Sequence, residues 1–414
     1  MNQQLIIGYD AKRIVRNGTG LGSYGRTLVN DIARCCGTGN HGDCPRDSSA
    51  AKIMGTVPVI LRLYAPNEGR DDLRRQVITR DNLSFCYPSH SVLPFHKATW
   101  RTKGIVKDLL RDGVQLYHGL SGELPIGIRK SGIKSVVTIH DLIFLRHPEF
   151  YNWVDTKIYA WKFRQTIREA DHIIAVSECT KRDIIEYGHI DESRISVIYQ
   201  SFAPRFNVSP SQGNHGDGNH GDCPRDSSAA KIMGTVPVIP SRYILSVGSI
   251  EARKNILLVV KALPYLPVDI NLVIVGRHTK YTDEVTAYAK ANRLEHRISI
   301  LHGVNDEELP ALYAGAEAFV YPSRYEGFGI PIIEAISMGL PVVACTGSCL
   351  EEAGGPDSLY VNPNDEQAMA HAIRQSLKGS DDREQRILRS REYIRRFEGR
   401  NVASQIIDLY HQLL

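Results

Sequence analysis

Short runs of apolar residues alternate with longer segments of helical periodicity along almost the whole chain. Most of the apolar runs are four or five residues long, which suits strands that are buried on both faces of a sheet. Strands that are separated by helices form βαβ units, and successive βαβ units build a parallel sheet. The sequence therefore predicts an α/β fold of doubly wound, Rossmann-like sheets.

The predicted elements fall into two groups. The strands of the first half are Leu5–Tyr9, Leu61–Ala65, Gln115–His118, Ser135–Ile139, His172–Val176 and Ile195–Tyr199, and its helices are Leu21–Arg34, Phe95–Arg111, Asn152–Ala170 and Glu178–Tyr187. The strands of the second half are Tyr243–Val247, Asn271–Val275, Ile298–Leu301, Ala318–Tyr321, Pro341–Ala344 and Ser358–Val361, and its helices are Ile256–Leu263, Asp283–Asn292, Asp306–Ala314, Pro331–Met338 and Asp365–Gly379.

A chain of 414 residues is too long for one ordinary domain and suits two. We predict a first domain over residues 1–205, a proline-containing linker over 206–240, a second domain over 241–391, and a helix over 392–414 that is interrupted near Gly399 and packs back on the first domain. Ligands of open parallel sheets bind beyond the carboxyl ends of the strands, so two such sheets facing each other are expected to enclose a deep cleft.

A block of 22 residues occurs twice, letter for letter, as Gly39–Ile60 and Gly218–Ile239. Solenoid repeats stack in series and diverge in sequence, whereas these copies start 179 residues apart. Their Gly, Ser, Asp and Pro residues are typical of surface loops, where an insertion costs little. We interpret both copies as recent in-frame insertions. A metal site built from His41, Asp43 and Cys44, with their counterparts in the second copy, is the less favoured alternative.

Composition narrows the class of protein. A formal net charge of +4 does not by itself indicate a nucleic-acid binder, and a hydrophobic content of 42% excludes general disorder. The eight cysteines occur singly or in pairs whose spacing matches neither a disulfide framework nor a complete metal site, which indicates reduced thiols. No apolar stretch approaches the roughly 18 residues of a spanning helix, and the first residues lack the pattern of a signal peptide. The sequence predicts a soluble, cytoplasmic protein without a nucleic-acid partner.

The strongest candidate site lies in Tyr321–Ala335, where an apolar strand leads through a Gly-rich loop into a helix. Pro331 suits a first helical position, so the amides of 327–330 are expected to point from a helix N-terminus, which favours an anion. Glu326 and Glu334 flank these amides. Carboxylates repel an anion, so we expect the pair to accept hydrogen bonds from sugar hydroxyls. For Glu334 alone, a solvated residue of a capped helix is the alternative.

Two further loops follow predicted strands. Arg253 and Lys254 place adjacent cations on one loop, which suits a diphosphate, and a solvated basic turn is the alternative. His140 ends a strand of the first domain, where it can hydrogen-bond a sugar, and a structural histidine is the alternative. The turn with Gly20 and Gly22 opens the first helix and should lie near His140, but it lacks the third glycine of a dinucleotide-binding fingerprint.

Together these motifs resemble the retaining glycosyltransferases of family four (glycosyl transferases group 1), which have the GT-B fold and use nucleotide-activated sugars. The resemblance rests on Glu326 and Glu334, eight apart around Gly-Phe-Gly-Ile-Pro, on Arg253-Lys254-Asn255, on Thr138-Ile-His140-Asp141 and on Pro322-Ser323. It covers nearly the whole chain outside the repeated blocks. The Glu-x-Arg-Lys-Asn text is similar to that of bacterial mannosyltransferases of O-antigen and exopolysaccharide assembly.

The resemblance implies that His140 and Glu326 are catalytic and lie at the transferred hexose. It implies a donor-binding set that consists of Gly20, Gly22, Arg253, Lys254, Val304, Leu309, Phe328, Gly329, Ile330 and Glu334. Within this set Arg253 and Lys254 hold the diphosphate, and Glu334 holds the ribose. The backbone amides of 328–330 bind the donor, and Val304 and Leu309 lie, with Asn305, near the nucleobase. Many relatives carry Arg where this chain has Ser249, so Arg253 is expected to supply that charge.

The implied function is transfer of a hexose, with mannose from GDP-mannose as the first choice, to a lipid-linked or polysaccharide acceptor with retention of anomeric configuration. The first domain then takes the acceptor and the second takes the nucleotide sugar. Catalysis must stabilise the charge that develops on the distal phosphate of the leaving group. Since no Asp-x-Asp motif of metal-dependent sugar transferases occurs in the sequence, Arg253, Lys254 and the helix N-terminus are expected to do this without a metal or another cofactor.

Two other functions stay open, namely a nucleotide-sugar epimerase of similar architecture and an inactive sugar-binding relative damaged by the insertions. The segment Phe95–Arg111 mixes basic residues with Phe95, Trp100 and Leu109. It suggests a peripheral contact with the cytoplasmic face of the inner membrane, and a solvated helix that covers the core is the favoured alternative.

Overall fold

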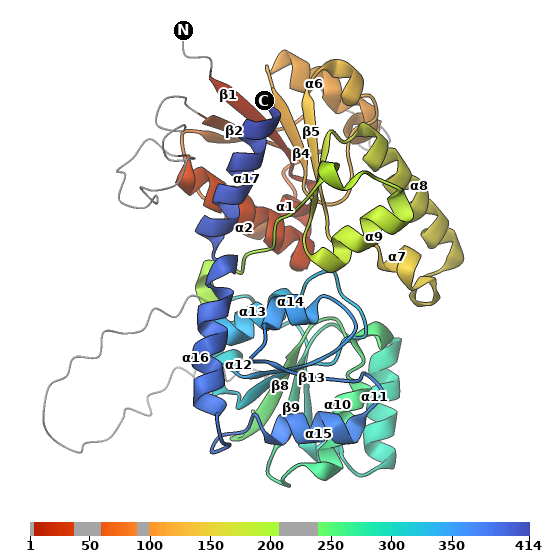
Figure 1. The fold of residues 1–414 in the computed structure, drawn as a ribbon, viewed down its shortest axis with the longest axis vertical. Helices are drawn as coiled ribbons and strands as arrows, with labels where there is room; N and C mark the ends of the chain where they lie inside the picture. Colours follow the sequence, from red (N-terminus) through yellow and green to blue (C-terminus); the bar gives the residue numbers. More distant parts are fainter. Residues whose placement is uncertain (1–3, 37–58, 89–98, 207–238) are drawn as a thin grey trace, which may run out of the picture. The chain divides into compact units, whose positions relative to one another are not determined.

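The computed structural model describes residues 4–36, 59–88, 99–206 and 239–414. The chain divides into two compact units. Unit 1 consists of residues 1–203, 326–330 and 396–414, and unit 2 consists of residues 204–325 and 331–395. Each unit is built around one parallel sheet with helices on both faces (Figure 1).

The described part of unit 1 contains seven parallel strands in the order β3-β2-β1-β4-β5-β6-β7. They are β1 (Leu5–Asp10), β2 (Val59–Tyr64), β3 (Leu83–Cys86), β4 (Leu116–Gly119), β5 (Lys134–Ile139), β6 (His172–Ala175) and β7 (Ile195–Val197). The order reverses between β1 and β4, which is the switch point of a doubly wound sheet. The apolar strands are buried on both faces because helices cover both.

The helices of unit 1 surround this sheet. They are α1 (Lys12–Arg16), α2 (Gly20–Cys35), α4 (Asp71–Arg74), α6 (Ile105–Arg111), α7 (Ile143–Arg146), α8 (Trp153–Glu169), α9 (Glu178–Gly188) and α17 (Gly399–Leu413). The last helix packs on α2, as the sequence predicted. A Cβ at Gly399 would overlap the carboxylate of Asp31, so glycine allows the two helices to approach closely where α17 begins.

The described part of unit 2 contains six parallel strands in the order β10-β9-β8-β11-β12-β13. They are β8 (Tyr243–Val247), β9 (Asn271–Val275), β10 (Ile298–Leu301), β11 (Ala318–Tyr321), β12 (Val342–Cys345) and β13 (Leu359–Val361). Its helices are α10 (Leu257–Ala262), α11 (Lys280–Ala291), α12 (Leu309–Gly315), α13 (Ile330–Ser337), α14 (Leu350–Gly354), α15 (Glu366–Arg374) and α16 (Arg383–Ile394). Its switch point lies between β8 and β11.

The predicted strands are confirmed to within two residues, and so is the doubly wound fold class. The pattern missed β3, a short edge strand that pairs only with β2 and whose Ser84 is exposed. It also missed α16, where charged residues dominate the helical text. The helix break near Gly399 is confirmed, since a 3₁₀ turn at Arg395–Phe397 separates α16 from α17.

Most of both repeated blocks lies outside the described residues, and so does the metal-site alternative in them. The end of the first block, however, is part of the fold. Val59 and Ile60, its last two residues, begin β2 and pair with Leu5 and Ile6 of β1. Val59 is also buried in the core. The first block therefore does not end where the fold resumes, because two of its residues belong to a strand.

The residues around Trp100 support the favoured interpretation of Phe95–Arg111, a helix that covers the core, and not the membrane contact. Residues 95–98 lie outside the described ranges, but Trp100 and Leu109 are buried in the core cluster on one face of the sheet. The Trp100 indole donates a hydrogen bond to Asp108 (2.7 Å). These apolar side chains cover the core, so they are not available to a membrane.

Candidate active site

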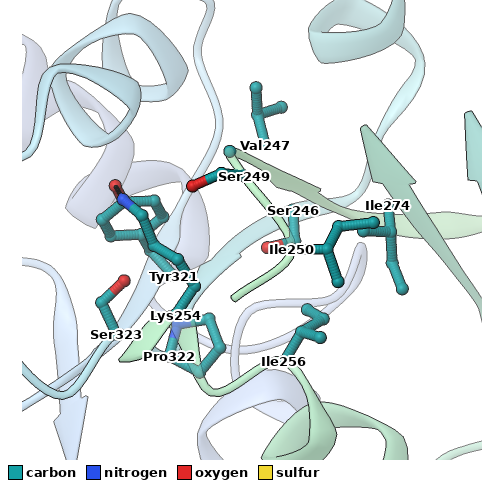
Figure 2. Close-up of a pocket in the computed structure, with 11 residues that line it drawn as sticks. Ser246, Val247, Ser249, Ile250, Lys254, Ile256, Ile274, Tyr321, Pro322 and Ser323 are labelled. Atoms are coloured by element: carbon teal, nitrogen blue, oxygen red, sulfur yellow. Dashed lines mark hydrogen bonds between the residues drawn. The ribbon is translucent and has the colours of Figure 1, made fainter. Parts of the chain in front are cut away.

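The switch point of unit 2 carries the cationic loop that the sequence singled out. The chain leaves β8 toward β9 on one side and leaves β11 toward β12 on the other, which opens a crevice between the two strand ends. Figure 2 shows the pocket that results. It is lined by Ser246, Val247, Gly248, Ser249, Ile250, Lys254, Ile256, Ile274, Tyr321, Pro322 and Ser323.

Lys254 ends a 3₁₀ turn in the loop after β8 and extends its amine to the end of β11. Its Nζ donates a hydrogen bond to the Tyr321 hydroxyl (2.6 Å) and lies 4.8 Å from the centre of that ring. Gly248 has φ = 150°, a left-handed conformation that favours glycine, and a Cβ there would lie 3.8 Å from the same Nζ. The amine of Lys254 therefore lies beside Gly248 at the carboxyl end of β8, where no side chain takes up the space (Figure 2).

Arg253 connects the loop after β8 with the loop after β11. Its guanidinium donates to the carbonyl of Tyr325 (2.7 Å), and its own carbonyl accepts from the amide of Arg324 (2.9 Å). Two bonds across the switch point fix the loops to each other. Arg253 is thus a structural tether in this state, in addition to any role that its charge has toward a diphosphate.

Ser323, which with Pro322 forms part of the family resemblance, is a polar residue of the same pocket. Its side chain is fully buried, and among the described residues its Oγ has no hydrogen-bond partner. A buried hydroxyl without a partner is costly, and such groups are rare in folded proteins. The hydroxyl lines the pocket beside Lys254, where a ligand oxygen would satisfy it (Figure 2).

Glu334 lies on α13 and is buried, unlike a solvated residue of a capped helix. The hydroxyl of Tyr313 on α12 donates to its Oε2 (3.2 Å). Burial raises the pKa of Glu334 to about 7, although the nearby Arg205 acts in the opposite direction. Leu309 precedes Tyr313 by one helical turn and so lies on the same side of α12.

α13 (Ile330–Ser337) is shifted by one residue from the predicted Pro331–Met338. Pro331 is its second residue, and Gly339 follows it with φ = 81°. The amide of Gly339 donates to the carbonyl of Ile336, and the amide of Leu340 donates to that of Ala335, both at 2.9 Å. This pair of bonds is the Schellman motif, which satisfies the last carbonyls of a helix.

The glutamate loop, residues 326–330, belongs to unit 1. The carbonyl of Gly327 accepts hydrogen bonds from Ser177 Oγ (2.6 Å) and Thr180 Oγ1 (3.2 Å) at the start of α9. A Cβ at Gly327 would overlap the carbonyl of His140, so only glycine allows this approach. The structure thus brings the loop of Glu326, itself buried, to the end of β5 that carries His140.

Phe328 anchors the same loop through an aromatic cluster of unit 1. Its ring lies 5.6 Å from that of Tyr199 and 5.2 Å from that of Phe397, in the turn before α17. Gly329 follows with φ = 127°, which favours glycine. The side chain of Phe328 is therefore packed away, and only its backbone amide is a candidate for binding a donor.

His140 is held as a neutral imidazole. Its Nε2 donates to the carbonyl of Leu120 (2.8 Å), so its Nδ1 accepts from the amide of Gln200 (2.5 Å). Burial lowers the pKa of His140 to about 4. The ring of Tyr24 packs against it edge-on, with 4.7 Å between the ring centres. Both ring nitrogens have partners here, so a side-chain hydrogen bond to a sugar requires one of them to be exchanged.

The two glycines in the first turn of α2, Gly20 and Gly22, have different roles. A Cβ at Gly22 would overlap the carbonyl of Asn17, so this glycine allows the helix to begin tightly against the preceding turn. Gly20 faces open space in the described structure. Of the pair, Gly20 is thus the one that leaves room for a ligand.

Sequence reasoning missed Gln200, and it noted Ser323 and Tyr313 only as part of the text that resembles the family, without a role for either. Each follows or packs on a strand end that was correctly predicted, but a lone Ser, Tyr or Gln carries no spacing signal. Their importance comes from burial and from the partner that each has or lacks, which only the fold reveals.

The fold and the site together define a GT-B glycosyltransferase. The chain belongs to the family-four retaining glycosyltransferases and is a hexosyltransferase. Residues 238–393 match the family model described as glycosyl transferases group 1, and residues 59–202 match the one described as glycosyltransferase family 4. This confirms the family that the motifs indicated. Enzymes of this family use nucleotide-sugar donors and generally need no metal ion.

Several curated proteins and solved structures are similar to the chain. O-antigen chain mannosyltransferase B of Escherichia coli is 29% identical over 303 residues, which cover 72% of this chain and 74% of that protein. The MMP alpha-(1->4)-mannosyltransferase of Mycolicibacterium hassiacum is 32% identical over 326 residues, covering 74% and 71%. The crystal structure of Anabaena HepE in complex with UDP and glucose has a TM-score of 0.67 at 18% identity, covering 99% of this chain and 100% of that one, which shows the fold alone.

Proposed function

We propose that the enzyme transfers mannose from GDP-mannose, with retention of configuration, to a lipid-linked or polysaccharide acceptor at the cytoplasmic face of a membrane. The predicted second domain, residues 241–391, would bind the nucleotide sugar, and the predicted first domain, residues 1–205, would bind the acceptor. Two relatives with names that specify mannosyl transfer support the sugar. The family supports retention and a nucleotide-sugar donor.

The observation that carries the donor site is the pocket between β8 and β11. It combines the amine of Lys254 with the buried, unpartnered hydroxyl of Ser323 at a sheet switch point. A diphosphate bound there would exchange the Lys254–Tyr321 bond for a charge-assisted bond to a phosphate oxygen. The distal phosphate gains negative charge as the sugar leaves, so Lys254 would stabilise the transition state more than the ground state.

The remaining roles are those that the family resemblance implies. Glu334 would accept hydrogen bonds from the ribose, with the nucleobase beside Val304 and Leu309. The amides of 328–330 would donate to the donor, and Glu326 would hold the hexose. His140 would contribute a neutral imidazole, because its lowered pKa keeps it uncharged at neutral pH.

A donor panel tests the function. GDP-mannose, UDP-glucose, UDP-galactose and UDP-N-acetylglucosamine would each be incubated with the enzyme and a bacterial lipid extract, and nucleoside diphosphate release and glycolipid formation measured. We expect transfer from GDP-mannose and an α-linked product by proton NMR. Formation of a free sugar epimer without acceptor would show an epimerase, and donor binding without transfer from any donor would show an inactive relative.

A further inference from the structure

Helix α8 of unit 1 has an apolar stripe on the face that points away from the protein. Its buried face consists of Ala160, Phe163, Thr166 and Ile167. Val154, Ile158 and Trp161, spaced i, i+4 and i+7, lie together on the opposite face. Figure 1 shows α8 at the outer edge of unit 1. A surface helix normally presents polar residues on that side.

These side chains are exposed to an unusual degree. Ile158 is 46% exposed, Trp161 is 52% exposed, and Trp153 at the helix start is 68% exposed. With Val154 and Tyr159 they are five of the eleven large apolar side chains that are exposed in the described chain. Single exposed apolar residues are ordinary, but a cluster on one element marks an interaction surface. We call Trp153, Val154, Ile158 and Trp161 the α8 outer face.

Basic side chains border one edge of the α8 outer face. They are Lys157, Arg164 and Arg168, spaced i, i+7 and i+11, whereas on the other edge Lys162 lies in line with Asp155 and Glu169. The Lys157 amine stands 4.7 Å from the centre of the Trp153 ring. An apolar centre of Trp and Ile with a basic margin is the pattern of a helix that lies in the interface of an anionic bilayer, where long basic side chains reach the headgroups.

A polar cavity of unit 1 opens beside the same helix. Trp161 and Lys162 line it together with Asp10, Arg101 and Glu123. Arg101 forms an ion pair with Asp10 (2.6 Å) and another with Glu123, which also accepts from Lys162 (3.0 Å). Asp10 ends β1, so this charged network lies at the switch point of the first sheet, where ligands of such sheets bind.

We propose that the α8 outer face docks the enzyme on an anionic membrane surface, and that the Asp10–Arg101–Glu123 cavity receives the polar head group of a lipid-linked acceptor. The second half of this proposal rests on the proposed transferase function. Trp161 belongs to the α8 outer face, Lys162 borders that face, and both line the cavity. A head group carried by the bilayer would therefore reach the cavity without leaving the membrane interface. The fixed ion pairs offer both carboxylates and cations to its hydroxyl and phosphate groups.

Vesicle sedimentation tests the docking. The full chain would be mixed with vesicles of phosphatidylcholine alone and with vesicles that also contain phosphatidylglycerol. We expect binding to the anionic vesicles only, and a loss of at least about tenfold in partitioning for the double variant Ile158→Glu/Arg164→Glu, since each basic residue near such a surface contributes roughly fivefold.

A matched control carries the same substitutions elsewhere. Leu388 on α16 is 58% exposed and Lys290 on α11 is also exposed, so Leu388→Glu/Lys290→Glu changes the charge and the apolar surface equally. We expect this variant to bind vesicles like the unaltered chain. An equal loss in both variants, or no vesicle binding by the unaltered chain, overturns the proposal.

Two further readouts separate the outcomes. Calorimetry with GDP and UDP on both variants reports the donor site: nucleotide binding without vesicle binding overturns the docking and leaves the proposed function standing. Vesicle binding without any nucleotide binding does the reverse. Light scattering reports the oligomeric state, and a dimer that the α8 variant abolishes, without vesicle binding, would show that this face joins two copies of the chain.

Discussion

Replacing Glu334 by Gln should make the unliganded enzyme more stable at neutral and alkaline pH. The carboxylate is buried with one neutral donor, the Tyr313 hydroxyl, and its ionised form is therefore poorly solvated. Glutamine has nearly the same shape and retains an oxygen that accepts from Tyr313. It removes the charge that burial penalises.

The magnitude follows from the pKa. Burial raises the pKa of Glu334 from the usual 4.5 to about 7. The folded protein therefore keeps a proton that the unfolded chain releases between these values, and stability falls as the pH rises through this window. At about 1.36 kcal/mol for each pH unit, the penalty reaches roughly 3 kcal/mol above pH 7 and vanishes below pH 4.5.

Urea unfolding followed by circular dichroism at about pH 5 and about pH 8 measures this difference. We expect Glu334→Gln to exceed the unaltered protein by up to about 3 kcal/mol at the higher pH and by much less at the lower one. Other titrating groups cancel because both proteins carry them. A difference that does not change with pH, or a less stable variant at pH 8, would refute the buried-carboxylate argument.

The same substitution, Glu334→Gln, should weaken binding of the nucleotide part of the donor. A carboxylate that accepts from ribose hydroxyls makes charge-assisted bonds, which are roughly twice as strong as neutral ones. We expect GDP to bind about tenfold more weakly to Glu334→Gln, which corresponds to about 1.4 kcal/mol. Stability gained and affinity lost in one variant would show that the burial of this charge serves binding.

Three other substitutions test the loops around the site. Ser323→Ala should raise the free energy of unfolding by about 1 kcal/mol, because it removes a buried hydroxyl without a partner, and should weaken nucleoside diphosphate binding; a destabilised variant in urea would contradict this. Arg253→Lys keeps the charge but loses the guanidinium that reaches the Tyr325 carbonyl, so amide hydrogen exchange in this loop should become faster. An unchanged exchange rate would show that Arg253 does not tether the two loops. Gly327→Ala places a Cβ on the carbonyl of His140 and should lower stability by about 1 to 3 kcal/mol in a thermal melt, whereas a neutral effect would show that the loop gives way freely.

Much of the fold could be predicted because its determinants are local. The run Tyr243–Val247 is mostly apolar and is followed by Gly248, so these six residues alone predict both the strand and its end. The stop of α13 at Gly339 has the same character. By contrast, β3 depends on pairing with β2, and its own residues do not distinguish it from a loop.

The candidate site was predictable in outline but not in detail. The cations and glutamates occur at strand ends, which spacing reveals. That Arg253 binds a backbone carbonyl, and that both nitrogens of His140 have partners, are consequences of packing between segments far apart in sequence. Trp100 and Trp161 look alike in the sequence, so the sequence could not tell which of the two would be exposed. One fills the core and the other is exposed.

Calorimetric titration of GDP in the presence of EDTA tests the central claim most directly, namely that Lys254 and the switch-point pocket hold the diphosphate without a metal ion. Lys261→Ala is a matched control for Lys254→Ala, since each amine lies over a tyrosine ring, that of Tyr288 or that of Tyr321. We predict that the unaltered enzyme and Lys261→Ala bind GDP equally well in EDTA, and that Lys254→Ala binds at least about tenfold more weakly. Loss of binding in EDTA, or full affinity in Lys254→Ala, would contradict the account.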